Sequence, residues 1–296
     1  MSNNGPSLAD VILPVFQPMP VTRKVSSASF ATPAPEASQS YSYSNLEGTD
    51  SARNELAEEV ALAIAYNGIS QAVMLVSPTD LEDFIVGFSL GSGIIASHDE
   101  IYDFKISGCG SAMQAEVEIA SRAFWELKQQ RRQLAGTSGC GLCGVEAVEQ
   151  ALPDLKALPG APLPPIEWLE GLRQRIGEFQ PLGRHCGAVH AAVFMDGNGQ
   201  LLLGREDIGR HNALDKLIGA LIRQDIPLAG GVAIVTSRCS LELIQKVLRA
   251  GIQTLVSLSS PTGLALQWAR RHNLNLIHLP QKSAPRVYSP AMEIQA

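Results

Sequence analysis

The sequence predicts an α/β protein in which helices cover both faces of a mixed sheet, after a smaller α+β domain and a disordered N-terminal tail. Apolar strand-like runs alternate with helical patterns from residue 187 to 279, as expected for βαβ units. Hairpin signals dominate residues 56–119. The first 50 residues are rich in Ser, Pro, Ala and Asn, and they lack the apolar surface that would offset the entropy cost of ordering.

These patterns place four segments along the chain. We expect a disordered tail over 1–50 and an N-terminal α+β domain over 51–150 that ends in a mobile Cys-x-x-Cys loop. A Pro-, Leu- and Ala-rich linker over 151–165 then leads to an α/β ligand-binding domain over 166–296.

The N-terminal domain is predicted to begin with a hairpin. The apolar runs 60–65 and 72–76 flank Asn67-Gly68, which is a strong turn signal between strands. A helix is expected after Asp80, where acidic residues occupy the first turn and apolar residues recur at helical spacing. Strands are expected over 101–106 and 115–119, and a helix is expected from Ser121.

The second half is predicted to contain a short helix over 168–176, a hairpin around 196–199 and then alternating elements. Strands are expected over 232–235, 254–258 and 274–279, with helices before and between them. Gly251 is expected to end the helix that contains Leu241, Ile244 and Leu248.

Composition narrows the class of protein. The net charge of −6 argues against a general nucleic-acid binder. No apolar run approaches the roughly 18 residues of a membrane span, and no secretory signal is visible. The five cysteines, an odd number in a chain of 296 residues, suit the reducing cytoplasm better than a disulfide framework.

The most chemically suggestive stretch is the glycine-rich loop that carries Cys140 and Cys143. Lys128, Arg131 and Arg132 precede it, and a helix is expected to begin near Val145. Nearby cations and a helix N-terminus lower the pKa of a thiol, so we predict that the loop carries an activated thiolate.

Several chemistries remain open for this pair. Zinc would need further ligands, but there is no second C-x-x-C and the other cysteines are isolated. A thioredoxin-like motif would follow a strand, whereas this one follows a helix. A sulfur relay, in which one cysteine carries sulfur as a persulfide, is compatible with a glycine-rich loop and two neighbouring thiols. The remaining alternative is that both cysteines are purely structural. A zinc deaminase is disfavoured because Ala192 stands where H-x-E, starting from His190, requires Glu.

A second candidate site lies where the predicted strands end. Ligands of open α/β sheets bind outside the carboxyl ends of the strands. Ser237, Arg238, Ser260 and Thr262 follow two strand ends, and small hydroxyl residues at helix starts favour phosphate groups. Ordinary helix capping is the alternative to phosphate binding for each of these residues. Four further polar residues also have a structural explanation: local salt bridges for Asp207 and Lys216, and structural hydrogen bonds for His190 and His211.

Several motifs occur in order along the chain: Tyr66-Asn67-Gly68-Ile69-Ser70, Asp80-Leu81-Glu82-Asp83-Phe84, Gly139-Cys140-Gly141-Leu142-Cys143-Gly144, His190-Ala191-Ala192 and the run from Asp207 to Lys216. Ser237-Arg238 and Ser259-Ser260-Pro261-Thr262 add support. From about Leu56 to Tyr288, the chain with these motifs resembles the formate dehydrogenase accessory proteins, the FdhD family of sulfur carriers.

The resemblance implies a sulfurtransferase with a cytidine-deaminase-like fold that acts as a homodimer in the cytoplasm. A cysteine desulfurase would load Cys140 with persulfide sulfur, with Cys143 as its partner. The sulfur would pass to the molybdenum bis(molybdopterin guanine dinucleotide) cofactor, bound as substrate and mimicked by GDP, for the formate dehydrogenase catalytic subunit. No permanently bound cofactor, metal, nucleic acid or membrane is expected.

The resemblance also places cofactor contacts just after the last predicted strand. Counting back from Val287-Tyr288 assigns them to Leu279, Pro280, Gln281, Lys282, Ser283 and Ala284. This stretch departs from the family pattern of an aromatic and basic residues, and Cys239 stands where a small Ala is common. Two other functions remain open: a chaperone that only escorts the cofactor, and a Cys-x-x-Cys redox exchanger.

Overall fold

A computed structural model describes residues 36–46, 51–135 and 152–290, all of which belong to one compact unit. Cys140, Cys143 and the expected helix near Val145 lie outside the described residues. The proposed division into domains at 150 and 165 therefore stays a prediction.

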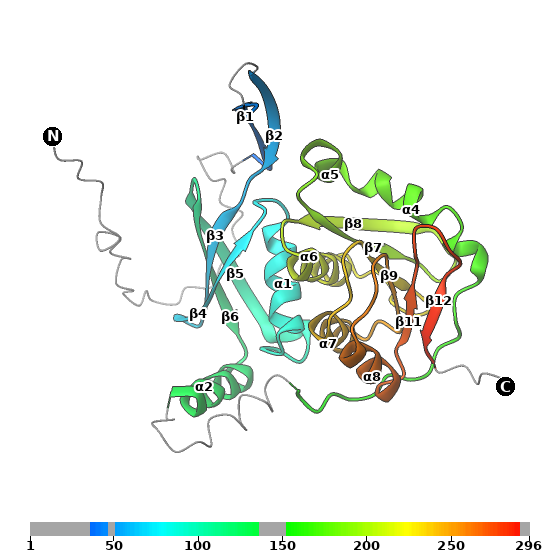
Figure 1. The fold of residues 1–296 in the computed structure, drawn as a ribbon. Helices are drawn as coiled ribbons and strands as arrows, with labels where there is room; N and C mark the ends of the chain where they lie inside the picture. The colour runs from blue at the N-terminus through cyan, green and yellow to red at the C-terminus, as the bar shows by residue number, and fades with distance from the viewer. Residues whose placement is uncertain (1–35, 47–50, 136–151, 291–296) are drawn as a thin grey trace. The chain divides into compact units, whose positions relative to one another are not determined.

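A four-stranded sheet forms the N-terminal part, in the order β4-β3-β6-β5 (Figure 1). The Asn67-Gly68 hairpin is confirmed, because β3 pairs antiparallel with β4 and both turn residues adopt positive φ. The elements are β3 (Val60–Tyr66), β4 (Ile69–Val76), α1 (Leu81–Gly91), the 3-10 helix η2 (His98–Glu100), β5 (Ile101–Cys109), β6 (Ala112–Ile119) and α2 (Ser121–Ala135).

A six-stranded sheet forms the C-terminal part, in the order β12-β11-β10-β9-β7-β8. The middle strands β9, β10 and β11 are parallel, while β7 and β8 form the predicted antiparallel hairpin. The elements are β7 (His190–Met195), β8 (Leu201–Asp207), α6 (Arg210–Arg223), β9 (Val232–Val235), α7 (Leu241–Ala250), β10 (Thr254–Ser257), α8 (Gly263–Arg271), β11 (Asn275–His278) and β12 (Arg286–Ser289). Gly251 ends α7 in the left-handed conformation, as predicted.

Strand β12 is an element that the sequence did not predict. It is four residues long, it forms one edge of the sheet, and its pairing with β11 is interrupted between Leu276 and Ile277. So short a run has no clear period of two, and its pairing partner rather than its own pattern makes it a strand.

Both faces of the six-stranded sheet are covered. One face packs Phe194, Val235 and Leu255 against α6, α7 and α8. The other face packs Val193 and Ile277 against a run of short helices. These helices are η3 (Ile166–Leu169), α4 (Leu172–Arg175), η4 (Ile176–Phe179) and α5 (Pro181–Cys186), so the single helix expected near Trp168 is broken into pieces.

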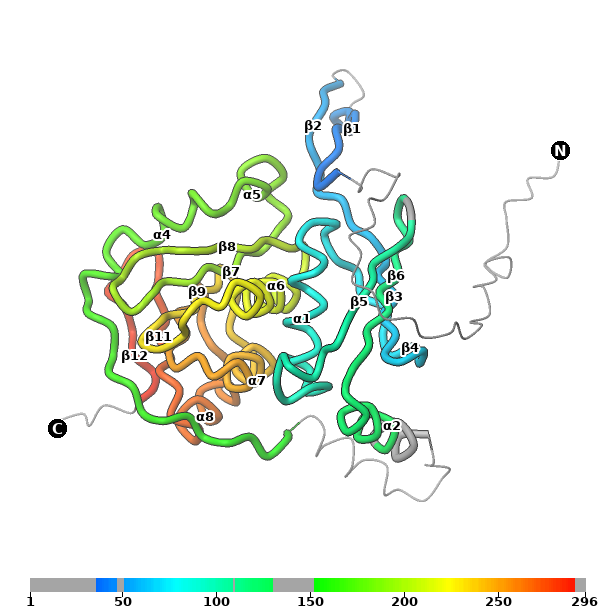
Figure 2. Tube along the Cα trace, turned by 180° about the vertical axis from the view of Figure 1, so that it is seen from behind, coloured from blue at the N-terminus to red at the C-terminus, as the bar shows by residue number. Residues whose placement is uncertain are grey.

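Helix α1 connects the two parts of the fold. It lies beside α6 in both views (Figures 1 and 2) and makes its main contacts with that helix. Its buried residues Phe84, Ile85 and Phe88 join the same apolar core as Leu214, Leu217 and Ile218 of α6. The two sheets therefore share one hydrophobic core through a helix pair.

Part of the expected disordered tail is ordered, which corrects that prediction. Ser38–Ser44 form β1, which pairs along its length with β2 (Ser51–Ala57). The run Ser-Tyr-Ser-Tyr-Ser alternates with a period of two, and pairing with β2 supplies hydrogen-bond partners for its peptide groups. Residues 1–35 and 47–50 lie outside the described residues.

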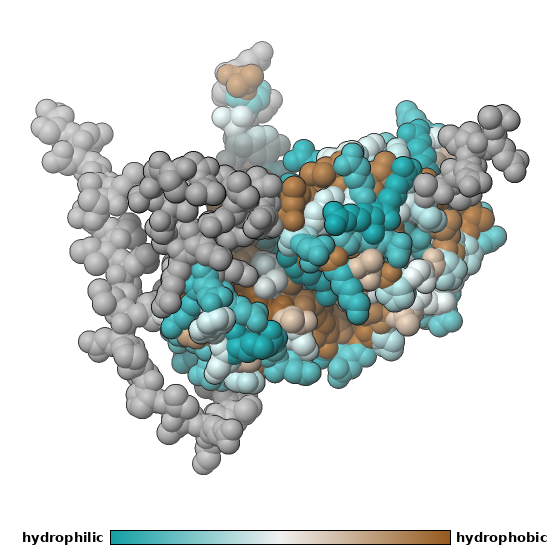
Figure 3. Space-filling model, turned by 90° about the horizontal axis from the view of Figure 1, so that it is seen from below, coloured by the Kyte–Doolittle hydropathy of each residue, from teal (hydrophilic) through white to brown (hydrophobic). Residues whose placement is uncertain are grey.

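The surface view from below shows hydrophobic residues interspersed with hydrophilic ones (Figure 3). Scattered apolar exposure of this kind is ordinary for folded proteins. Over residues 36–46, 51–135 and 152–290, no helix is long and apolar enough to cross a membrane.

Candidate functional site

The loops after β9, β10 and β11 come together at one edge of the six-stranded sheet. The three strands are adjacent and parallel, so their carboxyl ends point the same way. Residues 237–240, 259–262 and 279–284 follow these ends, and we call the three loops together the rim. The structure thus brings together at this edge the residues that the sequence predicted to bind the ligand: Ser237, Arg238, Ser260, Thr262 and 279–284. Cys140 and Cys143 lie outside the described residues.

Side-chain exposure divides the rim residues into two groups. Ser237 and Leu279 are only 5% and 7% exposed, and Leu279 packs in the core beneath α4. Its side chain therefore cannot reach a ligand in solution. Pro280 is half-buried, and the following rim residues are exposed and able to touch a ligand: Arg238, Ser260, Thr262, Gln281, Lys282, Ser283 and Ala284.

Hydrogen bonds hold the first two rim loops against each other. The buried Ser257 hydroxyl contacts the carbonyl oxygens of both Ser237 and Ser259. The Thr262 amide donates to Cys239 O at 3.0 Å. The Thr262 hydroxyl accepts from the Ala265 amide at 3.3 Å, so helix capping does account for this residue.

The same edge continues onto β7 and β8. His190 begins β7 opposite Asp207 at the end of β8, and the Ala191 amide donates to Thr236 Oγ1 beside the rim at 2.9 Å. Burial and the charge of Arg210 lower the pKa of His190. Burial also lowers the pKa of His211, which contacts Glu242 at 2.6 Å.

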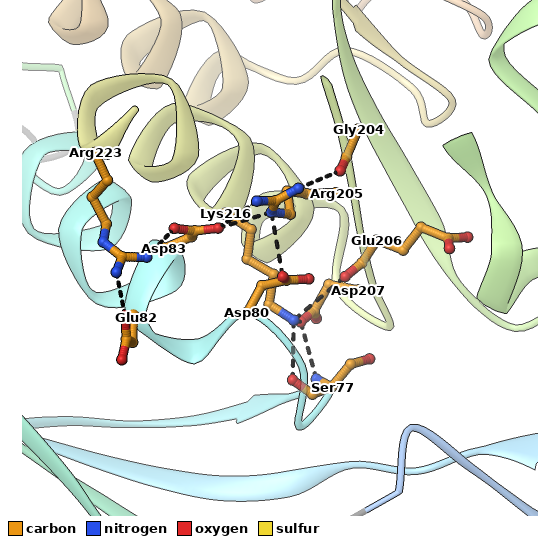
Figure 4. A network of polar contacts seen from close by, with 10 residues as sticks. All are labelled: Ser77, Asp80, Glu82, Asp83, Gly204, Arg205, Glu206, Asp207, Lys216 and Arg223. Carbon is orange, nitrogen blue, oxygen red and sulfur yellow. Dashed lines mark hydrogen bonds and ion pairs between the residues drawn. The ribbon is translucent and has the colours of Figure 1, made fainter. Parts of the chain in front are cut away.

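Asp207 is the centre of a buried polar network that joins the two parts of the fold (Figure 4). Its Oδ2 accepts from the Ser77 amide at 3.0 Å and lies 2.7 Å from Lys216 Nζ. Its Oδ1 accepts from the Gly209 amide at 2.8 Å and from Asn212 Nδ2 at 2.9 Å. These bonds fix the first turn of α6, where Arg210 and His211 begin.

The structure confirms the predicted salt bridge between Asp207 and Lys216. Both residues also bond to Ser77, which is far away in the sequence. Both side chains are fully buried, and Lys216 Nζ donates to Ser77 O at 3.0 Å as well. Burial lowers the pKa of Lys216, while Asp207 opposes that change. An ion pair so placed specifies geometry more than it adds net stability.

A second group of charges in Figure 4 ties β8 and α6 to α1. Arg205 contacts Asp83 at 2.8 Å and Asp80 at 3.4 Å. Arg223 contacts Asp83 and Glu82. Asp83 is only 4% exposed, so it needs both guanidinium partners to offset its desolvation.

Cys239 lies at the rim, but its thiol is buried. Its side chain is fully buried, and burial raises the pKa of its thiol to about 12. Cys186 is a half-buried free thiol. Within the described part of the chain, no group of three His, Cys, Asp or Glu side chains is placed to hold a metal ion.

Sequence reasoning missed Arg173, which contacts the start of the rim loops from the sheet face that the short helices cover. Its Nη2 donates to Leu258 O and to Leu279 O, each at 2.6 Å. These partners are 85 and 106 residues away in sequence. Arg173 lies in the four-residue helix α4, whose sequence carries no local signal for such a role, so only the tertiary structure reveals it.

Comparison with known proteins gives one consistent family. The family model described as FdhD/NarQ matches residues 57–295. Two relatives named "Sulfur carrier protein FdhD" come from Bordetella bronchiseptica and Cupriavidus necator. The first is 40% identical over 243 residues, covering 82% of this chain and 88% of its own length. The second is 40% identical over 247 residues, covering 82% and 84%.

One solved structure shows the same fold. It is a formate dehydrogenase accessory protein from Desulfotalea psychrophila, with a TM-score of 0.64 and 24% identity. The match covers 86% of this chain and 96% of that one. The family match begins at the end of β2 and includes the whole rim, the Asp207 network and both loop cysteines. The chain therefore belongs to the FdhD/NarQ family.

Proposed function

We propose that this protein is a sulfur carrier that serves formate dehydrogenase maturation. The observation that carries the proposal is the 40% identity, over most of the chain, to proteins named as sulfur carriers. The sequence also contains a thiol pair that this chemistry needs, at Cys140 and Cys143. We propose that the protein works as a homodimer in the cytoplasm, on a cytidine-deaminase-like scaffold. The strand order β8-β7-β9-β10-β11 supports that scaffold.

The first half of the proposed reaction exchanges one sulfur–sulfur bond for another. The Cys140 thiolate attacks the outer sulfur of a persulfide on a cysteine desulfurase. The donor's S–S bond breaks, the donor leaves as a thiolate, and Cys140 becomes the persulfide. No net electrons are consumed, so the step needs only a thiolate in reach of the donor.

The second half releases the sulfur at the oxidation level of sulfide, which takes two electrons. Cys143 supplies them: its thiolate attacks the inner sulfur of the Cys140 persulfide. The terminal sulfur then leaves as hydrosulfide, and a Cys140–Cys143 disulfide remains. A cellular dithiol reductant restores the two thiols.

The rim is the proposed binding site for the acceptor, the molybdenum bis(molybdopterin guanine dinucleotide) cofactor. Arg238 and Lys282 are exposed cations there, in a chain whose net charge is −6. Helix α8 also directs its N-terminus toward this edge, beginning right after Thr262. Cations and helix N-termini bind phosphate groups, which the two guanine dinucleotide arms carry.

The primary experiment is intact-protein mass spectrometry after incubation with a cysteine desulfurase and cysteine. The wild-type chain is expected to gain the mass of one sulfur, which a reductant removes, and Cys140→Ala is expected to gain none. The half-buried Cys186 provides the matched control, because Cys186→Ala should load like wild type. If the desulfurase turns over and the wild type gains no sulfur, the sulfur-carrier proposal is wrong and the chaperone or redox function replaces it.

The acceptor site is tested separately, with GDP as the probe. Calorimetry is expected to show GDP binding to the wild type and weaker binding to Arg238→Gln. Arg122→Gln removes another exposed arginine, on α2, and should bind GDP like wild type. The rim would lose its assignment if GDP did not bind at high micromolar protein.

A further inference from the structure

Arg173 joins the ends of two neighbouring strands through a single nitrogen atom. Strands β10 and β11 end at Ser257 and His278, and the next carbonyls belong to Leu258 and Leu279. Nη2 of Arg173 donates to both carbonyl oxygens at 2.6 Å. The guanidinium approaches from α4, on the sheet face opposite α6, α7 and α8.

These two carbonyls lie where the sheet stops holding the strands together. The amides of Leu258 and Leu279 still donate to the neighbouring strands, to Val235 O and Ser257 O, each at 2.9 Å. The carbonyls of the same residues accept from Arg173 instead. Residues 259–262 and 280–284 begin directly afterwards, so Arg173 is bonded to both strand ends at the points where two of the three rim loops begin.

The surroundings of Arg173 are also electropositive. His278, which is 6% exposed, lies near both Arg173 and Arg286, and its ring stacks on Tyr288 at 6.4 Å between ring centres. Burial and these two arginines lower the pKa of His278. Within the described residues, Arg173 Nε and His278 Nδ1 are buried without hydrogen-bond partners. Arg173 and Arg286 therefore place positive charge near the end of β11.

We propose that Arg173 is a positioning residue for guanine-nucleotide binding: it holds the loops after β10 and β11 at the spacing that the diphosphate requires. The inference rests on the proposed function, since it takes the rim as the acceptor site. Arg173 acts through the two loops it joins, and its positive charge adds to the attraction for the diphosphate.

Arg175 is a matched control on the same helix. Its guanidinium also donates to two backbone carbonyls, those of Trp168 and Gly199, each at 3.0 Å. Gly199 lies in the β7–β8 turn, beyond Met195, which pairs with Val232 at the start of β9. Arg175 therefore makes the same kind of bridge at the end of the sheet where the parallel strands begin, whereas the rim lies where they end.

The test compares GDP affinity and thermal stability in Arg173→Met and Arg175→Met. Each variant loses two hydrogen bonds from a charged donor to backbone carbonyls, so both are expected to melt at lower temperature. GDP affinity by calorimetry should fall about tenfold or more in Arg173→Met and stay within about twofold of wild type in Arg175→Met.

Each result decides between the two proposals. Wild-type affinity in Arg173→Met, or equal losses in both variants, overturns the role of Arg173 and leaves the sulfur-carrier function standing. Failure of GDP to bind the wild-type chain overturns the acceptor site, and the role of Arg173 with it. If Arg173→Met does not fold, Arg173→Lys replaces it. Its ammonium lacks the planar donor geometry, so it should weaken GDP binding by about threefold or more.

A spectroscopic measurement separates positioning from general destabilisation. The ring proton of His278, assigned with His278→Gln, is followed by NMR as the pH is changed. Loss of the Arg173 charge should raise the pKa of His278 in Arg173→Met, whereas Arg175→Met should leave it unchanged. An unchanged His278 titration in Arg173→Met would contradict the position of the Arg173 guanidinium at the end of β11, on which the proposal depends.

Discussion

Gly87 in α1 and Gly219 in α6 cross so closely that neither position has room for a side chain. A Cβ atom on Gly87 would lie 1.8 Å from Asp215 O, and one on Gly219 would lie 1.8 Å from Asp83 O. The two helices thus meet backbone against backbone, which brings Asp83 within reach of Arg205 and Arg223. The crossing sets how the four-stranded sheet docks on the six-stranded sheet.

Replacing either glycine should disrupt this crossing. Gly87→Ala is expected to lower the free energy of unfolding by about 3 kcal/mol or more, because the neighbouring groups are backbone atoms that cannot rotate away. Chemical denaturation measures the change. Gly177→Ala is the control, since a Cβ there meets nothing within 4 Å. Equal stability of the two variants would show that the helices can separate at little cost.

Lys216 should be essential for stability only while Asp207 is charged. Lys216→Met leaves the Asp207 carboxylate buried without its cation, and the expected loss is about 3–5 kcal/mol. The double variant Asp207→Asn/Lys216→Met should recover part of that loss, because no unpaired charge remains. Urea denaturation of the single and double variants tests this coupling, and additive losses would argue against it.

His190 should make the protein less stable as the pH falls through 6.5. Burial and Arg210 lower the pKa of His190 below its ordinary value of 6.5, so between the two pKa values the unfolded chain binds more protons than the folded chain. The free energy of unfolding therefore rises with pH across that interval. The contribution of neutral His190 is lost as the pH falls through the interval, and the loss is complete below the pKa of the folded chain.

The measurement is the melting temperature at several pH values between 7.5 and 5. His190→Gln should show a smaller decrease on acidification than the wild type. His98→Gln, which replaces an exposed histidine in η2, should behave like the wild type. A decrease in His190→Gln as large as that in the wild type would mean that protonation of His190 does not oppose folding.

Cys239 should take no part in sulfur loading. With its pKa raised to about 12, almost none of its thiol is ionised at neutral pH, and the side chain is fully buried. Cys239→Ala is expected to gain the same sulfur mass as the wild type from a desulfurase. Alkylation offers an independent check: iodoacetamide should label Cys239 after denaturation only, and labelling in the native protein would overturn this view.

The sequence by itself determined most of the local structure, because the relevant signals lie within a few residues. Asn67-Gly68 specified a hairpin, Gly251 ended α7, and the apolar run Val232–Val235 matched β9. The order of strands and helices also implied that the ends of β9, β10 and β11 share an edge. The thiol pair Cys140 and Cys143, outside the described residues, is likewise visible from the sequence alone.

Tertiary structure alone decided how these elements support a site. The contacts of Asp207 with Ser77, and of Arg173 with Leu279, join residues more than 100 positions apart. β12 became a strand because β11 offered it an edge. Local propensity carries no information about such pairings, since their free energy comes from groups that meet only after the chain has folded.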